Sequence, residues 1–174
     1  MKLVTAIVKP FKVDDVKAAL KAAGFAAPEI LALDFDAGLL LIEHLGSEPI
    51  ADTGGPIPGR YAAAAALLAE IHTRPWSPDM PAADGVVHRV PDYDRGAMAI
   101  ETELLIDWYV PYALGRQASA EERAAFAGAW GRLFDRLDNA ERSLVLRDYH
   151  SPNLIWRVGR SGSDRLGIID FQDA

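Results

Sequence analysis

Three polar residues near the end of the sequence have the types and spacing that phosphoryl transfer requires. Asp148 stands five residues before Asn153, and Asp170 follows a later apolar run. Phosphoryl transfer needs a carboxylate that orients the acceptor hydroxyl, and it needs oxygen ligands for a magnesium ion that neutralises phosphate charge. Carboxylate and amide oxygens are hard ligands that magnesium accepts. The pattern therefore predicts Asp148 as the group that orients the hydroxyl, with Asn153 and Asp170 as magnesium ligands.

Other polar and aromatic features have simpler structural explanations. His150 lies in the same loop, but a lone loop histidine is more often a hydrogen-bonding structural residue than a metal ligand. The segment 53–60 (TGGPIPGR) lacks the Lys-Ser/Thr ending of a phosphate-binding P-loop, so we expect a plain loop. Trp108, Tyr109 and Tyr112 have rings that can stack on a sugar, but aromatic residues of an apolar helix mostly fill a core.

Composition excludes several broad classes of function. The chain has 174 residues, half of them apolar and a quarter charged, which is typical of a soluble globular protein. The net charge of -7, without a basic patch, argues against nucleic-acid binding. No cysteine is present, so disulfides and thiolate chemistry are excluded and a reducing cytoplasm is expected. No apolar stretch has the length of a membrane span or the pattern of a signal peptide.

The first half of the sequence alternates apolar runs with turn-forming segments. Runs at 3–8, 30–35 and 39–45 predict strands, the last two joined as a hairpin by the Asp-Ala-Gly turn at 36–38. Helical spacing from position 14, closed by Gly24, predicts a helix. Further expectations are a loop at 46–60, an alanine-rich helix at 61–72 and a Pro-rich loop at 74–91.

The second half is expected to be helical before it ends in short strands that position the polar residues. A helix is predicted at 97–109, and Ser119 with Glu122 forms a capping-box signature for a long helix that ends near 138. Short apolar runs at 144–146, 154–157 and 166–169 predict strands.

The C-terminal motifs resemble a known family. An Asp five residues before an Asn, with a separate Asp after an apolar strand, is the spacing of a kinase catalytic loop. Residues 146–156 (LRDYHSPNLIW) and 167–174 (GIIDFQDA) resemble the aminoglycoside phosphotransferase and choline kinase family, over roughly 26–174. Their wording is most similar to bacterial cell-wall sugar kinases, which phosphorylate N-acetylmuramate and N-acetylglucosamine at the anomeric position. The segment 101–115 resembles a helix typical of that group.

The resemblance implies an α+β, protein-kinase-like fold that holds ATP and Mg²⁺ in a cleft between two lobes. It implies that Asp148 is the catalytic base and that Asn153 and Asp170 hold the magnesium. The segment 40–46 (LLIEHLG) resembles the strand and hinge between the lobes, so Glu43 and Leu45 are the expected nucleotide-binding residues. The implied substrate is a small-molecule sugar or an aminoglycoside, first an amino sugar of cell-wall recycling, and neither nucleic acid nor membrane is an expected partner.

Both ends of the sequence depart from this family pattern. No glycine precedes Gly24, so the glycine-rich loop that covers the phosphates is missing. Residues 1–25 instead resemble the first strand and helix of P-II nitrogen-regulatory proteins, and family members continue beyond the equivalent of position 174 into helices that complete the acceptor pocket. We therefore expect a P-II-like β-α segment at 1–25, an incomplete N-lobe with the hinge at 26–46, and a mostly helical, C-terminally truncated C-lobe at 47–174.

Three interpretations of function follow. The favoured one is an ATP-dependent phosphotransferase. The second is a P-II-type regulatory protein that forms trimers and binds ATP and 2-oxoglutarate, which residues 1–25 alone support. The third is a folded but inactive remnant, because loss of the glycine-rich loop and its partner lysine removes much of the electrostatic stabilisation that phosphoryl transfer needs.

Overall fold

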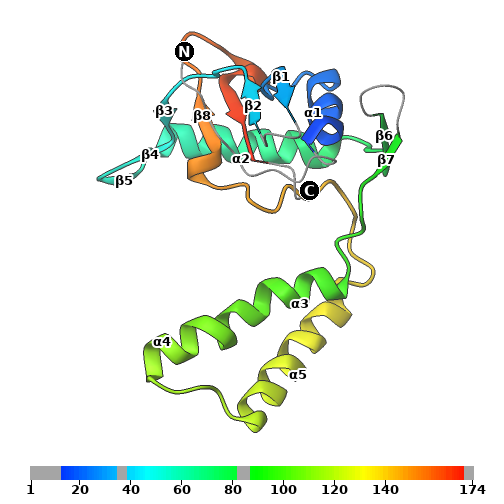
Figure 1. The fold of residues 1–174 in the computed structure, drawn as a ribbon, viewed down its shortest axis with the longest axis vertical. Helices are drawn as coiled ribbons and strands as arrows, with labels where there is room; N and C mark the ends of the chain where they lie inside the picture. Colours follow the sequence, from blue (N-terminus) through cyan, green and yellow to red (C-terminus); the bar gives the residue numbers. More distant parts are fainter. Residues whose placement is uncertain (1–12, 35–38, 82–86, 171–174) are drawn as a thin grey trace. The chain divides into compact units, whose positions relative to one another are not determined.

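The computed structural model describes residues 13–34, 39–81 and 87–170, which form two compact units (Figure 1). The first unit contains the described residues up to 91 and from 143 onward, and the helical unit spans 92–142. Helices and sheets occur together, which confirms the expected mixed class. The predicted strand at 3–8 and the turn at 36–38 lie outside the described residues. The predicted boundaries after 25 and 46 both fall inside the first unit and stay predictions.

A three-stranded antiparallel sheet carries the C-terminal motifs in the first unit. Its strands, in spatial order, are β3 (Glu48–Pro49), β8 (Leu154–Trp156) and β9 (Leu166–Ile168). β8 and β9 confirm the strands predicted at 154–157 and 166–169. On its other edge β9 meets Ala26, whose carbonyl accepts a hydrogen bond of 2.8 Å from the Ile168 amide. All residues of β9 are buried, as expected of a strand with partners on both sides.

Two helices pack into the same core. α1 spans Val13–Ala22, and Gly24 follows it two residues later. Gly24 has a φ of +86°, a left-handed conformation that glycine adopts without strain, so the predicted cap is confirmed. α2 (Pro58–Thr73) buries Ala64, Leu67 and Ile71, which share one helical face. It begins three residues earlier than predicted, because proline fits the first turn of a helix where its missing N–H is not needed.

Three hairpins complete the first unit. β1 (Ile30–Asp34) and β2 (Leu39–Ile42) pair antiparallel as predicted. The segments expected to be loops at 46–60 and 74–91 also contain strands: β3, β4 (Ala51–Asp52) with β5 (Gly55–Pro56), and β6 (Asp79–Pro81) with β7 (Val87–Arg89). The prediction that 46–60 and 74–91 are loops without strands was wrong. Gly, Pro and Asp are common in loops, but they also close tight hairpins. The Asp52 carboxylate accepts a 2.7 Å hydrogen bond from the Gly54 amide, and Gly55 has a φ of +107°.

The predicted strand at 144–146 was also wrong. Leu144 and Leu146 are buried while Val145 is exposed, which is the alternation that suggested a strand. No strand among the described residues pairs with this segment. Both edges of β8 and of β9 already have neighbours, so neither strand can pair with residues 144–146. The burial of this segment therefore alternates although it forms no ladder of hydrogen bonds.

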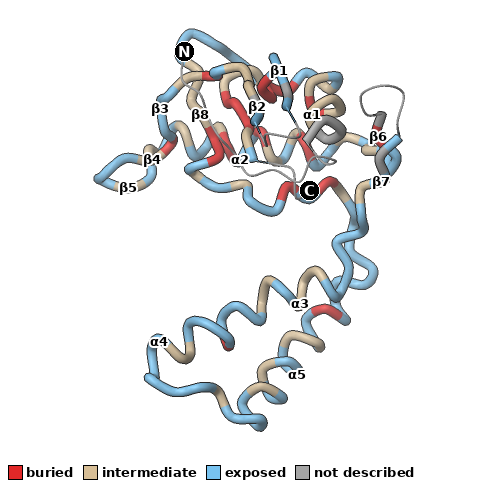
Figure 2. Tube along the Cα trace, viewed as in Figure 1, coloured by how far each residue is buried: buried red, intermediate tan, exposed pale blue. Residues whose placement is uncertain are grey.

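The core of the first unit joins these elements (Figure 2). It combines residues of α1, α2, β6, β8 and β9 with the segment before Asp148, and its large members are Leu20, Phe25, Ile50, Leu67, Ile71, Met80, Leu144, Leu146, Leu154, Leu166 and Ile168. Leu146, Leu154 and Ile168, which lie within two residues of the polar positions, are therefore fixed in a packed interior.

The helical unit consists of a long helical run and one returning helix (Figure 1). The run comprises α3 (Arg95–Leu104), a π-helical segment (Leu105–Tyr109) and α4 (Val110–Leu114). The helix predicted at 97–109 is thus longer than expected. The returning helix, α5 (Ala120–Leu137), confirms the long helix predicted from the capping box. No helix in the described part of the chain has the length and hydropathy to span a membrane.

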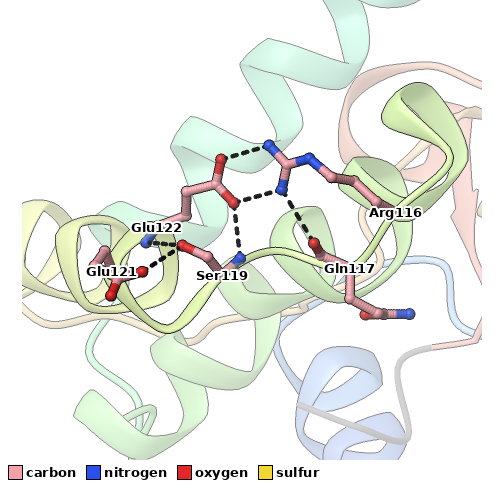
Figure 3. A network of polar contacts seen from close by, with 5 residues as sticks. All are labelled: Arg116, Gln117, Ser119, Glu121 and Glu122. Carbon is pink, nitrogen blue, oxygen red and sulfur yellow. Dashed lines mark hydrogen bonds and ion pairs between the residues drawn. The ribbon is translucent and has the colours of Figure 1, made fainter.

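The loop before α5 is closed by a network of polar contacts (Figure 3). The Ser119 hydroxyl accepts a hydrogen bond from the Glu122 amide at 3.2 Å, and the Glu122 carboxylate accepts one from the Ser119 amide at 2.8 Å. Arg116 donates two further bonds of 2.8 Å to the same carboxylate. These donors lower the pKa of Glu122 to about 2, with the Arg116 contact as the largest cause.

This network predicts a pH-dependent contribution to the stability of the helical unit. A carboxylate with a lowered pKa stabilises the fold fully above its ordinary value of 4.5 and loses that contribution as the pH falls towards 2. Glu122→Gln should therefore lower the thermal midpoint of helix unfolding at pH 7, and the difference from the parent should shrink between pH 4.5 and pH 2. Circular dichroism melts across this range measure it, with Glu141→Gln as an exposed control. A difference that does not change with pH would contradict the assignment.

Candidate functional site

The register of β8 and β9 brings two of the predicted site residues to one end of the sheet. Leu154 pairs with Ile168, so Asn153 and Ile169 stand opposite each other one residue further along. The Ile169 amide donates to the Asn153 carbonyl at 3.0 Å and extends the ladder to this point. Asp170 follows directly, and its Oδ2 lies 3.4 Å from Nδ2 of Asn153. The two proposed magnesium ligands are therefore adjacent because of backbone pairing.

The side-chain amide of Asn153 is held from its nitrogen end. This side chain is 8% exposed and is the buried polar residue of the described core. Its Nδ2 donates to the backbone carbonyl of Asp148 at 3.1 Å and lies 3.4 Å from both His150 Nε2 and Asp170 Oδ2. Its Oδ1 accepts no hydrogen bond from the described residues and is not sealed from solvent. The carbonyl end of the amide is thus presented outward, as a metal ligand would be.

Asp148 is fixed through its backbone while its side chain is exposed. Its carbonyl accepts two hydrogen bonds, from the His150 amide at 2.9 Å and from Asn153 Nδ2 at 3.1 Å. The preceding Arg147 has a φ of +43°, and Asp170 has a φ of +56°. Left-handed backbone is costly for such residues and concentrates at functional sites, where the surrounding structure enforces it. All three predicted residues therefore meet in one hydrogen-bonded cluster.

His150 has the hydrogen-bonding role that was expected of it. Its amide donates to the Asp148 carbonyl, and its own carbonyl accepts a 2.9 Å bond from the Asn153 amide. These bonds form a tight turn that leads into the short 3-10 helix Ser151–Asn153. The residue thus shapes the loop between Asp148 and Asn153.

Tyr149 is a contributor that the sequence reasoning did not identify. Its hydroxyl donates a 2.8 Å hydrogen bond to the backbone carbonyl of Ala64 in α2, and its ring packs against the core. Burial raises the pKa of this hydroxyl to about 12, so it remains a proton donor at ordinary pH. The signal in the sequence that could have indicated this contact is a tyrosine inside a polar motif. A tyrosine that becomes buried needs a hydrogen-bond partner for its hydroxyl.

The two residues predicted for the hinge, Glu43 and Leu45, lie between β2 and β3, and Leu45 contacts Gly167 of β9. Glu43 caps the β1–β2 hairpin, because its carboxylate accepts a 3.2 Å bond from the Glu29 amide and its own amide donates to the Glu29 carbonyl at 2.7 Å. The Leu45 side chain is buried against Gly167. No described residue forms a hydrogen bond with the backbone of Leu45. The structure thus assigns Glu43 a structural contact and leaves the Leu45 peptide groups available.

The aromatic residues of the helical unit do not fill a core, contrary to expectation. The exposed fractions of Trp108, Tyr109 and Tyr112 are 74%, 61% and 87%. Within the described unit only Ile106 and Phe134 are buried, because two packed helices enclose little volume. A separate groove of about 190 Å³ lies between α3 and α5, lined by Phe126 and Trp130 among others.

The polar cluster fits a magnesium ion that is shared with a phosphate. Among the described residues, no group of three or more His, Asp or Glu side chains is placed to hold a metal ion. Asn153 and Asp170, whose side chains are in contact, would supply two hard oxygen ligands to such an ion. Mg²⁺ is commonly held by one or two protein oxygens, with substrate phosphates and water completing the octahedron. The donor set therefore fits a nucleotide-bound magnesium better than a site made by protein alone.

Comparison with known proteins gives the family. The model of the phosphotransferase enzyme family (APH) matches residues 12–174. The chain belongs to this family. Similar relatives are the N-acetylmuramate/N-acetylglucosamine kinases of Caulobacter vibrioides, 32% identical over 158 residues, and of Pseudomonas aeruginosa, 31% identical over 159 residues. Each alignment covers 89% of this chain, and 43% and 42% of the respective relative. The family resemblance seen in the motifs is thereby confirmed.

The extent of the family match adds two facts. The chain spans less than half the length of the curated relatives it matches. The match begins at residue 12, earlier than the expected start near 26, so α1 lies within the family region. The P-II resemblance of residues 1–25 finds no support in these relatives and stays a prediction.

The packing of Gly167 on the hinge predicts a strong effect of a single methyl group. A Cβ at this position would lie 2.7 Å from Leu45 Cδ1 and 3.2 Å from Leu45 Cβ, so the hinge or β9 must shift. Gly167→Ala should lower the free energy of unfolding by about 1–3 kcal/mol, measured by urea denaturation. In Gly59→Ala the new methyl group meets open space near the start of α2, and stability should stay constant or rise by up to about 1 kcal/mol. Equal unfolding free energies of the two variants would contradict the predicted close contact.

Proposed function

We propose that this chain carries the catalytic site of an ATP-dependent phosphotransferase that acts on a hydroxyl group of an N-acetylated amino sugar. The observation that supports it is the cluster in which Asn153 Nδ2 contacts the Asp148 carbonyl and the Asp170 carboxylate. In this cluster the Asn153 amide contacts both the backbone of Asp148, whose side chain is exposed, and the carboxylate of Asp170. Phosphoryl transfer requires this combination of a hydroxyl-orienting group and magnesium ligands.

The proposed reaction transfers one phosphoryl group and releases one proton. The acceptor oxygen forms a bond to the γ-phosphorus of ATP while the bond from that phosphorus to the β,γ-bridging oxygen breaks, and ADP leaves. Asp148 orients the acceptor hydroxyl and takes its proton, because its side chain is exposed while its backbone is held by two hydrogen bonds. The products are ADP, the phosphorylated sugar and a proton that returns to solvent.

Asn153 and Asp170 are the proposed magnesium ligands, and Glu43 and Leu45 are the proposed hinge contacts. When bound, the magnesium ion neutralises charge on the β- and γ-phosphate oxygens. The outward Oδ1 of Asn153 and the carboxylate of Asp170 would hold it. The peptide groups of Leu45 offer a donor and an acceptor to an adenine ring, whereas the Glu43 side chain serves the hairpin.

The acceptor is proposed from the relatives. They are named as kinases of N-acetylmuramate and N-acetylglucosamine, both N-acetylated amino sugars. The anomeric hydroxyl is the proposed position of transfer. An aminoglycoside hydroxyl remains the alternative acceptor within the family and is included in the test.

Substitution of Asp148 tests the proposal. The parent chain should transfer the γ-phosphate of Mg·ATP to N-acetylmuramate or N-acetylglucosamine, and Asp148→Asn should reduce kcat about 10²–10⁴-fold with little change in ATP affinity. Asp170→Asn should instead weaken binding of Mg·ATP. Radiolabelled phosphate transfer and calorimetric nucleotide titration measure the two effects.

Asp92→Asn is the matched control, because within the described part of the chain this exposed carboxylate makes only a 3.6 Å ion pair with Arg142, and it lies in the helical unit. It should match the parent in both measurements. A folded parent that neither binds Mg·ATP nor transfers phosphate would overturn the proposed function. Transfer to an aminoglycoside alone would correct the acceptor and retain the reaction.

A further inference from the structure

The side chain of Tyr149 attaches the catalytic loop to α2. Its hydroxyl bonds the Ala64 carbonyl at 2.8 Å, joining residues that lie 85 positions apart in the sequence. Ala64 is buried in the middle of α2, so its carbonyl belongs to a rigid and well-packed element. Tyr149 itself is half-buried and packs against the core. The contact therefore connects an exposed loop, the kind of segment that usually moves most, to a buried part of a helix, the kind that moves least.

The bond from Tyr149 to Ala64 lies next to Asp148 in the sequence, so it affects the position of Asp148. Asp148 directly precedes Tyr149, and the Asp148 carbonyl accepts bonds from the His150 amide and from Asn153 Nδ2. Leu146 is buried on the other side of Asp148. The exposed carboxylate of Asp148 thus stands between two anchored side chains, with the left-handed Arg147 completing the reversal. Without the tyrosine anchor, the residue that directly follows Asp148 would lose its bond to α2.

We propose that Tyr149 is a positioning residue that holds the Asp148 carboxylate and the Asn153 amide in their reactive arrangement through its hydrogen bond to α2. The bond is neutral at every assay pH, since the raised pKa of about 12 keeps the hydroxyl protonated. Its loss leaves the Ala64 carbonyl with its helical partner, so the cost in stability is small. The cost in geometry is larger, because misplacement of a reacting group by about 1 Å lowers rates by roughly 10²-fold.

This inference rests on the proposed function, and two readouts separate them. Tyr149→Phe removes the hydroxyl and keeps the ring in the core. Tyr61→Phe removes the hydroxyl of another tyrosine near the start of α2 and is the matched control. The first readout is steady-state kinetics of phosphate transfer by the full chain. The second is hydrogen–deuterium exchange of the peptide 148–154, whose His150 and Asn153 amides donate within the loop.

Tyr149→Phe should lower kcat at least tenfold while KM for ATP changes less than about twofold, at a temperature where the variant is folded. It should also accelerate exchange in 148–154, and Tyr61→Phe should change neither quantity. An unchanged exchange rate in Tyr149→Phe overturns the positioning role whether or not the chain is active. If Tyr149→Phe exchanges faster than the parent but the parent transfers no phosphate, the anchor is supported and the proposed function is refuted. A kcat equal to that of the parent, with only a lower melting temperature, shows that the hydrogen bond is merely structural.

Discussion

The pairing of β8 with β9 is the constraint on which the rest of the site depends. It sets Leu154 opposite Ile168, and the ladder continues through the Ile169 amide and the Asn153 carbonyl. A shift of the pairing by one residue would turn every side chain to the opposite face and separate the amide from Asp170. Burial of β9 between β8 and the segment at Ala26 makes such a shift costly, since it would move Leu166 and Ile168 out of the core. Site geometry is therefore a consequence of how the core packs.

Two residues with left-handed backbone, Arg147 and Asp170, are held in place by this packing. Arg147 and Asp170 each hold a positive φ, at a cost of about 1 kcal/mol or more. They stand where a buried segment must stop and present a polar group outward: Arg147 after buried Leu146, and Asp170 after β9. The backbone bonds to the carbonyls of Asp148 and Asn153 compensate for that cost by fixing the chain on either side. Strain and packing thus act together to leave Asp148 and Asp170 exposed while the Asn153 amide between them in sequence stays buried.

Sequence patterns predicted those parts of the structure that depend on local chemistry. The spacing of Asp148, Asn153 and Asp170 identified the cluster, and Ser119 with Glu122 identified the start of α5, because each signal lies within a few residues or within one hairpin. The contacts of Tyr149 with Ala64 and of Leu45 with Gly167 join distant segments, and no local pattern encodes such a partner. The small strands at 48–56 were missed for a related reason, since turn residues mark a reversal without showing whether the flanking residues pair.

The segments at 144–146 and 108–112 show why apolar patterns alone mislead. Leu144 and Leu146 alternate with Val145 as strand residues do, but alternation reports which side chains are buried and not whether a neighbouring strand is present. Trp108 and Tyr112 lie on an apolar helical run, but such a run buries its side chains only where another element covers it. In the described helical unit, α3 and α5 contact each other along one face, where Arg95 bonds Asp138 at 3.5 Å and Phe134 is buried. A hydrophobic sequence therefore predicts which side chains tend to be buried. The tertiary structure decides which of them another element covers.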